Sequence, residues 1–466
     1  MPWALPIIGH LHLLGQYEVP YQAFKVISKT HGSIFRLKLG VVPAIVVNGL
    51  ENIKEVLFVK ATDFDGRPNI SRYNDLFSGN RENSLAFCNF SNLQKLRREI
   101  LQVHTFPRNF SSRFLKLDSI INLEMNELKS KINKENCLTN FKIHLSSTIA
   151  NVFFIYFCSK RFDTSLPKFQ EMIQNYDSVF YEVNQGYASD FLPWLSYFQS
   201  KNHTRKLSQM SKAIRAFVME NLMNDRIVKY ERNERNNNDE EDYVDSLLER
   251  VYNNRDKAKM DLNTALFSLE DIVGGHTAIS NFIMKTLGFL VNHPNVQAKI
   301  QKEVDAITLI SRDVTLADRK QMPYTEATIL ESIRMIASPI VPHVATQNSS
   351  IGGFEVKKDT MIFLNNYDLN MSPELWSEPE NFQPERFINA DGRIVKPEHF
   401  LPFSGGRRSC MGNKMVQLIS FTTLASLFQS YDLKKLPGQQ YKVPIGDLAL
   451  PYNTFRFNFS PRNLRL

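Results

Sequence analysis

Cysteine is scarce in this chain, with four residues among 466. They are Cys88, Cys137, Cys158 and Cys410, and their separations form no paired spacing. Small secreted domains that depend on disulfides are dense in cysteine, so the sequence does not favour a disulfide framework. A reducing compartment is the environment that this cysteine usage indicates.

Long apolar runs, linkers and basic stripes are also missing. The longest apolar run, residues 152–158, is far shorter than the roughly 18 residues of a membrane span and is predicted to lie in the core. No Gly/Ser-rich or Pro-rich linker interrupts the chain, and the hydrophilic residues 229–245 are predicted to form a loop between helices. We therefore expect one domain over residues 1–466. The formal net charge of +8 is dispersed, which argues against nucleic-acid binding.

Periodicity predicts a mainly α protein with a minor β region. Residues 34–48 alternate around a glycine turn and predict a two-stranded hairpin. Helical patterns dominate after about residue 92, and a long apolar helix is predicted from near Asp261 to His293, where Pro294 ends it. Amphipathic spacing predicts a further helix over residues 295–307, and an apolar one over residues 411–428.

The most informative segment is residues 403–412, Phe-Ser-Gly-Gly-Arg-Arg-Ser-Cys-Met-Gly. It places Cys410 at the mouth of an apolar helix, where backbone amides favour a thiolate. Gly406 and Gly412 would let the backbone approach a flat cofactor, and Arg408 can pair with a carboxylate. Phe403 would shield the sulfur from water. These features suit an iron porphyrin bound through a thiolate, although a single cysteine is more often structural.

The full spacing Phe-x-x-Gly-x-Arg-x-Cys-x-Gly resembles the haem-binding signature of the cytochrome P-450 family at every fixed position. A c-type haem is excluded because the sequence has no Cys-x-x-Cys-His. The resemblance implies haem b with Cys410 as the axial ligand, a ligation that favours O–O cleavage. It also implies the family's triangular helical prism, with the haem between a long central helix and the cysteine-loop helix. The partner it implies is an NADPH-cytochrome P-450 reductase that supplies electrons.

Two further motifs match the family in the same order. Glu331 and Arg334 stand three residues apart, which places them on one helix face. Arg386 follows in Phe-Gln-Pro-Glu-Arg-Phe, 24 residues before the cysteine. The resemblance implies that Glu331, Arg334 and Arg386 form a buried ion cluster that fixes the segment before the haem loop.

Haem carries two propionates, so cations are expected near them. Arg408 is one candidate, and His343 stands where the family often places a propionate-binding residue. Arg97 or Lys95 would come from the helix at the opposite edge. Here the chain departs from the family's usual Trp-x-x-x-Arg, because Phe90 is the nearest aromatic and has no N–H to donate.

The predicted central helix departs further from the family. Members normally carry Ala/Gly-Gly-x-Asp/Glu-Thr-Thr/Ser there, and this chain has Gly274-Gly275-His276-Thr277-Ala278. The two glycines each cost about 1 kcal/mol in a helix interior, which is consistent with a kink at the oxygen site. Thr277 replaces the acid and Ala278 the threonine, so the usual proton relay is missing. His276 falls on the opposite side of the helix and is predicted to be a packed core residue.

Three sources of the proton remain open. It can come through Thr277, His276 and water, or from a hydroxyl of the substrate. A local backbone shift can instead bring Thr277 into the place of the missing threonine. Alternatively the protein needs no relay, because it rearranges an already oxidised substrate as a haem-thiolate isomerase or dehydratase. A non-catalytic protein that binds haem and a sterol is a further alternative.

Several segments resemble one branch of the family, the Spook/Spookier-type enzymes of arthropod ecdysteroid synthesis; they are residues 18–24, 79–86, 274–276, 338–346 and 365–370. The resemblance implies a monooxygenase that oxidises a sterol or steroid early in moulting-hormone synthesis. The opening residues 1–10 resemble the proline-rich hinge that follows an anchor helix in microsomal members. This implies the cytoplasmic face of the endoplasmic reticulum membrane, with the anchor missing from this sequence.

Overall fold

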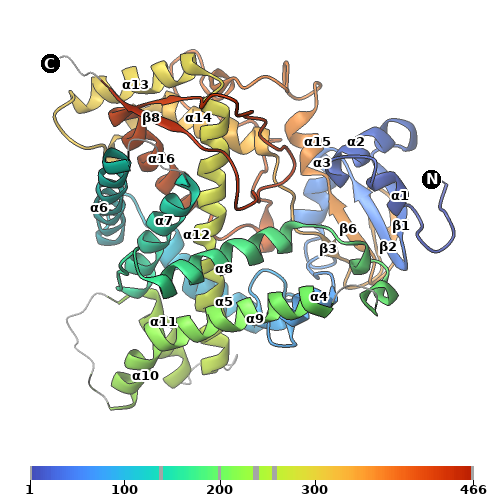
Figure 1. Cartoon of the computed structure of the whole chain (residues 1–466). Helices are drawn as coiled ribbons and strands as arrows, with labels where there is room; N and C mark the ends of the chain where they lie inside the picture. Colours follow the sequence, from blue (N-terminus) through green and yellow to red (C-terminus); the bar gives the residue numbers. More distant parts are fainter. Residues whose placement is uncertain are drawn as a thin grey trace.

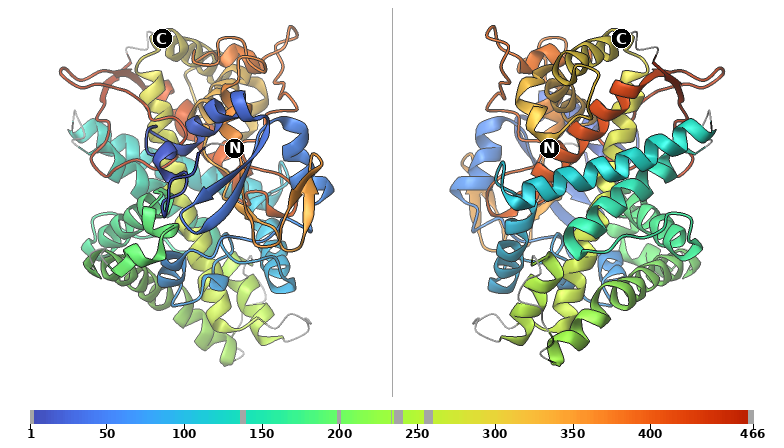
Figure 2. Two further views of the ribbon diagram at one scale, coloured as in Figure 1. Left: turned by 90° about the vertical axis from the view of Figure 1, so that its right-hand side faces the viewer. Right: turned by 90° about the vertical axis from the view of Figure 1, so that its left-hand side faces the viewer.

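The computed structural model describes residues 3–135, 140–197, 201–232, 234, 241–253 and 260–462. It is 57% helical. Most helices lie on one side of the molecule and a small sheet lies on the other (Figure 1). Figure 2 views these two sides, with the sheet facing the reader on the left and the long helix α6 on the right. The predicted fold class, mainly α with a minor β region, is confirmed. The prediction of one domain stays a prediction, and Cys137 lies outside the described residues.

Sixteen α-helices are found among the described residues: α1 (Leu11–Leu14), α2 (Pro20–His31), α3 (Leu50–Lys54), α4 (Ser71–Leu76), α5 (Asn92–Thr105), α6 (Ser112–Glu135), α7 (Phe141–Cys158), α8 (Pro167–Asn184), α9 (Lys201–Val218), α10 (Asn224–Glu231), α11 (Tyr243–Tyr252), α12 (Leu262–Leu290), α13 (Pro294–Thr308), α14 (Pro323–Ile336), α15 (Asn366–Met371) and α16 (Asn413–Ser430). Shorter 3-10 and π segments are η1 (Glu55–Val59), η2 (Arg81–Asn83), η3 (Ala188–Asp190), η4 (Pro193–Tyr197), η5 (Met219–Met223), η6 (Leu316–Gln321), η7 (Pro384–Phe387) and η8 (Gly406–Arg408).

Eight strands complete the described elements: β1 (Ile34–Leu39), β2 (Val42–Val47), β3 (His343–Val344), β4 (Ser349–Ile351), β5 (Phe354–Val356), β6 (Met361–Leu364), β7 (Tyr431–Lys434) and β8 (Asn458–Pro461). The largest sheet has the order β1-β2-β6-β3. Its β1–β2 hairpin confirms the one predicted over residues 34–48, and β2 pairs with β6 in parallel. The β3 strand pairs with β6 in the antiparallel sense and so fixes His343 at the inner edge of the sheet.

Helix α12 runs through the centre of the molecule (Figure 1). The Asp261 side chain caps its first turn by accepting a hydrogen bond from the Thr264 amide at 2.7 Å. The helix ends at Leu290, shortly before Pro294 opens α13, as predicted. It packs on α7, α8, α9, α11, α14 and α16, and most of its residues from Ala265 onward are buried.

Helix α7 is the one described helix that is long and apolar enough to cross a membrane, with a mean hydropathy of 1.3 over Phe141–Cys158. Its polar residues break up the apolar runs, which is why the sequence showed no span here. In the fold, 83% of these residues are buried against neighbouring helices. This degree of burial is typical of a core helix, and α7 packs against α12.

Candidate functional site

The Cys410 thiol lies at the N-terminus of α16, on the loop that follows η8. The Cys410 amide donates to the carbonyl of Phe403 at 3.0 Å, which closes the loop upon itself. Burial raises the pKa of the Cys410 thiol, while hydrogen bonds from the Gly412 and Asn413 amides and the positive charge of Arg98 act in the opposite direction. These amides stabilise a thiolate at this position, as they do at other helix N-termini.

The Cys410 side chain is accessible to solvent, although the thiol is surrounded by enough protein to be strongly desolvated. The accessibility of the side chain and the desolvation of the thiol are compatible if the sulfur faces an interior space rather than the outer surface. Cys88 and Cys158, by contrast, are packed in the core. Among the cysteines that the structure describes, Cys410 is thus the one that can reach a ligand.

The three glycines of the loop differ in how closely other atoms approach them. Gly406 has a φ of +62°, and a Cβ there would lie 2.2 Å from the carbonyl oxygen of Leu57, so it is required for packing against η1. Gly405, which sequence reasoning missed, is pressed against the Phe58 ring in the same way. At Gly412 a Cβ would lie 3.9 Å from the Cys410 sulfur, which is an ordinary van der Waals distance, so the expected approach of a cofactor to Gly412 stays a prediction.

Three arginines gather at one edge of this loop, and only Arg408 was predicted. Arg408 Nη2 donates to the Ala86 and Cys88 carbonyls at 3.1 and 2.8 Å. Arg67 donates to the Ala86 carbonyl and to two carbonyls before β3, and Arg98 Nη2 donates to the Ser409 carbonyl at 2.8 Å. Within the described residues, none of the three arginines forms an ion pair with a carboxylate.

The charges of these arginines repel one another. Burial lowers the pKa of all three guanidinium groups, and the charge of Arg408 lowers those of Arg67 and Arg98 further. A buried cationic cluster is costly without a counter-charge. An anionic group bound beside Cys410 would supply that counter-charge.

Unsatisfied polar atoms point to the same conclusion. Within the described residues, Nη1 of Arg408, Nε2 of His343 and both amide atoms of Gln94 are buried without a hydrogen-bond partner. His343 donates from Nδ1 to the Phe64 carbonyl at 2.6 Å, and burial together with Arg67 lowers its pKa. Buried polar atoms are normally paired, so these are expected to meet a ligand.

Arg97 and Arg98 are consecutive on α5 and extend to different parts of the site. Arg98 bonds the cysteine loop, whereas Arg97 Nε donates to Ser268 of α12 at 2.7 Å and its Nη2 lies 3.7 Å from Asp271. A propionate role for Arg97 therefore stays a prediction, and Arg98 is better placed for it. Gln94 lies four residues before Arg98, at the position of the tryptophan in Trp-x-x-x-Arg. The sequence pattern did not indicate Gln94, because the family has an aromatic residue at this position.

These residues fit a haem held through a thiolate. Cys410 offers the axial ligand, and its thiol accepts hydrogen bonds from the Gly412 and Asn413 amides. Arg67, Arg98, Arg408, His343 and Gln94 offer buried or half-buried donors for two propionates, and three of them have atoms without other partners. The donor set is cationic and neutral, which matches a dianionic group.

The accessible face of α12 is narrow. Between Ala265 and Leu290 the partly accessible residues are Asp271, Gly274, Gly275 and Ala278, and the other residues of that stretch are buried. Their spacing of i, i+3, i+4 and i+7 places them on one face of the helix. We call these four residues the α12 stripe. It contains both predicted glycines and no hydroxyl group.

Thr277 lies off this stripe. Its side chain is buried, and its Oγ1 lies 3.3 Å from Nε2 of His276. The Nδ1 of His276 is bonded to the Val273 carbonyl, which can only accept, so Nδ1 carries the proton. Burial lowers the pKa of His276 to about 4, which leaves Nε2 as the acceptor for the Thr277 hydroxyl. His276 also packs between the Tyr176 and Phe153 rings, which confirms the predicted core role.

The glycines of α12 allow close packing of neighbouring helices. A Cβ at Gly274 would lie 3.0 Å from the Tyr176 ring of α8, and one at Gly275 would lie 3.3 Å from the Phe153 ring of α7. Tyr176 also donates to the Glu270 carbonyl at 3.3 Å. Helix α12 is continuously α-helical across Gly274 and Gly275, with no π segment at this point.

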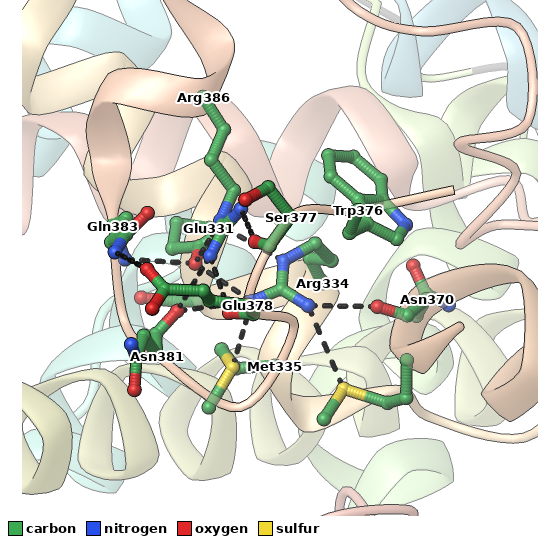
Figure 3. A network of polar contacts seen from close by, with 12 residues as sticks. Glu331, Arg334, Met335, Asn370, Trp376, Ser377, Glu378, Asn381, Gln383 and Arg386 are labelled. Carbon is green, nitrogen blue, oxygen red and sulfur yellow. Dashed lines mark hydrogen bonds and ion pairs between the residues drawn. The ribbon is translucent and has the colours of Figure 1, made fainter. Parts of the chain in front are cut away.

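The structure brings Glu331, Arg334 and Arg386 together as a buried ion cluster (Figure 3). Arg334 binds Glu331 through two hydrogen bonds of 2.8 Å, and Arg386 Nε donates to the same carboxylate at 3.2 Å. The Gln383 amide adds a fourth donor at 2.9 Å. Side chains of both Glu331 and Arg334 are fully buried. We call this the Glu331 cluster.

The arginines of the Glu331 cluster also hold the chain that leads to the cysteine loop. Arg334 Nη1 donates to the Asn370 carbonyl at 2.7 Å and its guanidinium lies over the Trp376 ring (Figure 3). Arg386 donates to the Ser377 and Glu378 carbonyls. The cluster thus joins α14 to the segment between α15 and η7.

Comparison with known proteins places these features in a family. The family model for cytochrome P-450 matches residues 1–459. The chain is 36% identical to cytochrome P-450 307a1 of Drosophila melanogaster, over 99% of this chain and 88% of that protein. It is 30% identical to cytochrome P-450 1A1 of Rattus norvegicus, over 94% and 85% of the two chains. It is 28% identical to the steroid 17-alpha-hydroxylase/17,20 lyase of Oryzias latipes, over 93% and 86%. The resemblance seen in the sequence is confirmed.

Proposed function

Because the chain belongs to the cytochrome P-450 family and is a monooxygenase, we propose that it oxidises a sterol or steroid with dioxygen at an early step of ecdysteroid synthesis. The electrons would come from NADPH through a cytochrome P-450 reductase. Membership of the family favours this oxidoreductase over the isomerase and over the non-catalytic protein. The resemblance to the Spook/Spookier-type branch, which includes the unusual segment 274–276, is the observation that carries the sterol proposal.

The surroundings of α12 support an apolar substrate. The stripe offers small side chains at Gly274, Gly275 and Ala278, and the neighbouring segment contributes Leu85 and Phe87. Phe87 stacks on Tyr73 with ring centroids 4.2 Å apart, which gives this wall a broad apolar surface. Sites of this kind bind mainly through apolar burial and a few placed polar groups. A steroid is named as the substrate of the Oryzias latipes relative.

The proposed cofactor is haem b. Cys410 would ligate its iron, and Arg67, Arg98, Arg408, His343 and Gln94 would hold its propionates. When bound, a thiolate-ligated haem supplies the activation of dioxygen. The Glu331 cluster would act at a distance, because it fixes the backbone that presents the cysteine loop.

The proton is proposed to come from the substrate or from water rather than from Thr277. The Thr277 hydroxyl is directed at His276 and lies off the stripe. The stripe itself has no alcohol that can replace the missing threonine. A hydroxyl carried by the substrate, or an ordered water, is then the group left to donate beside Gly274 and Ala278.

We place the protein at the cytoplasmic face of the endoplasmic reticulum membrane. Exposed apolar side chains support this proposal: Trp3 is 92% exposed, Ile7 71%, Val41 61% and Trp194 45%. Their segments are joined by backbone hydrogen bonds, from Gly40 to the Ile8 carbonyl at 3.2 Å and from Val41 to the Phe191 carbonyl at 3.0 Å. An exposed apolar surface of this kind suits a lipid surface.

The test of the proposed function is an incubation of the haem-loaded protein with reductase, NADPH and candidate sterols, followed by product identification. We expect consumption of NADPH that depends on both the reductase and the sterol, with a product that carries one oxygen from dioxygen. Turnover of a sterol peroxide without reductase, and none with it, would contradict the proposal in favour of the isomerase.

A further inference from the structure

Asp271 is the one polar side chain on the α12 stripe. It lies one turn before Gly274 and Gly275, and two turns before Ala278, which is about 10 Å along the helix. Its side chain is 19% exposed, while the neighbouring Glu270 faces away and is paired with Arg215 of α9 at 2.8 Å. A carboxyl group that is largely buried is costly unless it has hydrogen-bond partners.

The partners of Asp271 use only part of its bonding capacity. The Leu85 amide donates to its Oδ2 at 2.5 Å, and Arg97 Nη2 lies 3.7 Å from the same oxygen. The Ser84 hydroxyl adds a further hydrogen bond to the carboxyl group. A carboxylate has about four lone-pair sites, so at least one acceptor site remains for a donor from the accessible side.

The residues around Asp271 also border the proposed haem site. Ser84 and Leu85 hold Asp271, and the next residues of the same segment bind the cationic cluster. The Ala86 carbonyl accepts from both Arg67 and Arg408, and the Cys88 carbonyl accepts from Arg408. Within the short segment 84–88, the first two residues contact Asp271 and the later ones contact the arginines. Asp271 and the arginines are therefore in contact with the same short segment of the chain.

We infer that Asp271 binds a hydroxyl group of the substrate and so orients an apolar body above the haem. A cation is a poor match, because Arg97 already lies near this carboxyl group. A neutral donor on an apolar molecule satisfies the free acceptor site and leaves Leu85 and Phe87 to contact the hydrocarbon. Burial raises the pKa of Asp271, which further disfavours an isolated charge there and favours a hydrogen-bonded partner. The inference rests on the proposed function, a sterol-like substrate, and names the group by which that substrate is recognised.

The experiment measures binding, without turnover, from the change that a sterol causes in the haem absorption spectrum. Two ligands are compared: a 3-hydroxysterol and the same sterol without that hydroxyl. We expect the wild type to bind the hydroxysterol at least about tenfold more tightly, because a hydrogen bond to a charged group contributes about that much. In Asp271→Leu, which has no acceptor, the preference should fall to about twofold or less, mainly through weaker binding of the hydroxysterol. In Asp271→Asn, whose amide oxygen is an uncharged and weaker acceptor, the preference should fall to a value between those of the wild type and Asp271→Leu.

Glu270→Gln is the matched control, since it neutralises the adjacent buried acid outside the stripe. It should keep the wild-type preference. Only variants with the carbon monoxide spectrum of the wild type are compared. If Asp271→Leu does not fold, the isosteric Asp271→Asn is used to test the inference. A preference that persists in Asp271→Leu, or that is undiminished in Asp271→Asn, would overturn the inference, as would a wild type that binds both sterols equally. A wild type that binds neither sterol would overturn the proposed function, and this inference with it.

Discussion

The Oγ1 of Thr277 lies 3.3 Å from the Nε2 of His276, its neighbour on α12, and both side chains are buried. The carbonyl of Val273 fixes the histidine tautomer, so the Thr277 hydroxyl donates to the imidazole. The hydroxyl is therefore engaged within the helix packing and does not belong to the accessible stripe. The structure thus argues against the first and third sources of the proton that the sequence left open.

We expect Thr277→Val to leave coupling nearly unchanged, because its hydroxyl is not part of the stripe. The measurement is the ratio of sterol product to NADPH consumed, which should stay within about twofold of the wild type. Ala278→Thr, which restores an alcohol to the stripe, should not raise sterol turnover when the substrate or water supplies the proton. A large gain in Ala278→Thr would mean that the wild-type relay is defective.

Removing one partner of the Glu331 cluster should destabilise the fold strongly. Glu331→Gln leaves Arg334 buried without its counter-charge, which should cost about 3–5 kcal/mol in the free energy of unfolding. The exposed pair of Glu18 and Lys442 is the control, because Glu18→Gln should cost less than about 1 kcal/mol. Denaturant unfolding of the two variants measures both. Equal losses would show that the cluster is not a structural centre.

Gln94 should contribute to haem retention. Gln94→Leu removes a buried donor that can meet a propionate, and a hydrogen bond to a charged group contributes about 1.5–3 kcal/mol. We therefore expect haem to transfer to apomyoglobin about tenfold to a hundredfold faster than from the wild type. Lys95→Leu, at a side chain that is 63% exposed, is the control and should change the rate by less than about threefold. A wild-type rate in Gln94→Leu would remove Gln94 from the site.

Lys285 should give the protein a pH-dependent stability in the alkaline range. It is fully buried on α12, where its ammonium group donates to the carbonyls of Pro444 and Asp447. Burial lowers its pKa from 10.5 to about 8. Between these values the unfolded chain binds the proton more tightly, so stability rises with pH across this window and is lost as the pH falls through 8.

Relative to Lys285→Met, the wild type should therefore gain about 3 kcal/mol in the free energy of unfolding between pH 8 and 10.5. Urea unfolding at several pH values measures the difference between the two proteins. The exposed Lys442→Met is the control and should follow the wild type. Parallel curves for the wild type and Lys285→Met would mean that Lys285 keeps its ordinary pKa.

Much of the fold follows from local patterns in the sequence. Asp261 and Pro294 bound α12, and the alternation of residues 34–48 gives β1 and β2, because caps and periodicity act over a few residues. The Glu331 cluster was indicated by a family pattern, the order of Glu331, Arg334 and Arg386, and not by a local one. Such patterns record contacts between distant segments.

The rest depended on contacts that no local pattern encodes. Gly406 is required by the Leu57 carbonyl, more than 300 residues earlier. Arg67 reaches the cationic cluster through the carbonyls of Ala86, Val341 and Pro342, which are distant in the sequence, and neither Arg67 nor Gln94 carries a motif of its own. The family pattern places its acid at position 277 and gives no signal for Asp271. A helix of this length presents either residue to the site depending on how neighbouring helices turn it.

Ligation of haem by the Cys410 thiolate is the central assignment for this protein. The measurement is the absorption spectrum of the reduced, haem-loaded protein under carbon monoxide. The wild type should show the red-shifted Soret band of thiolate ligation, and Cys410→Ser should lose it while Cys88→Ser, at a buried core cysteine, keeps it. An unshifted band in the well-folded wild type would contradict the assignment.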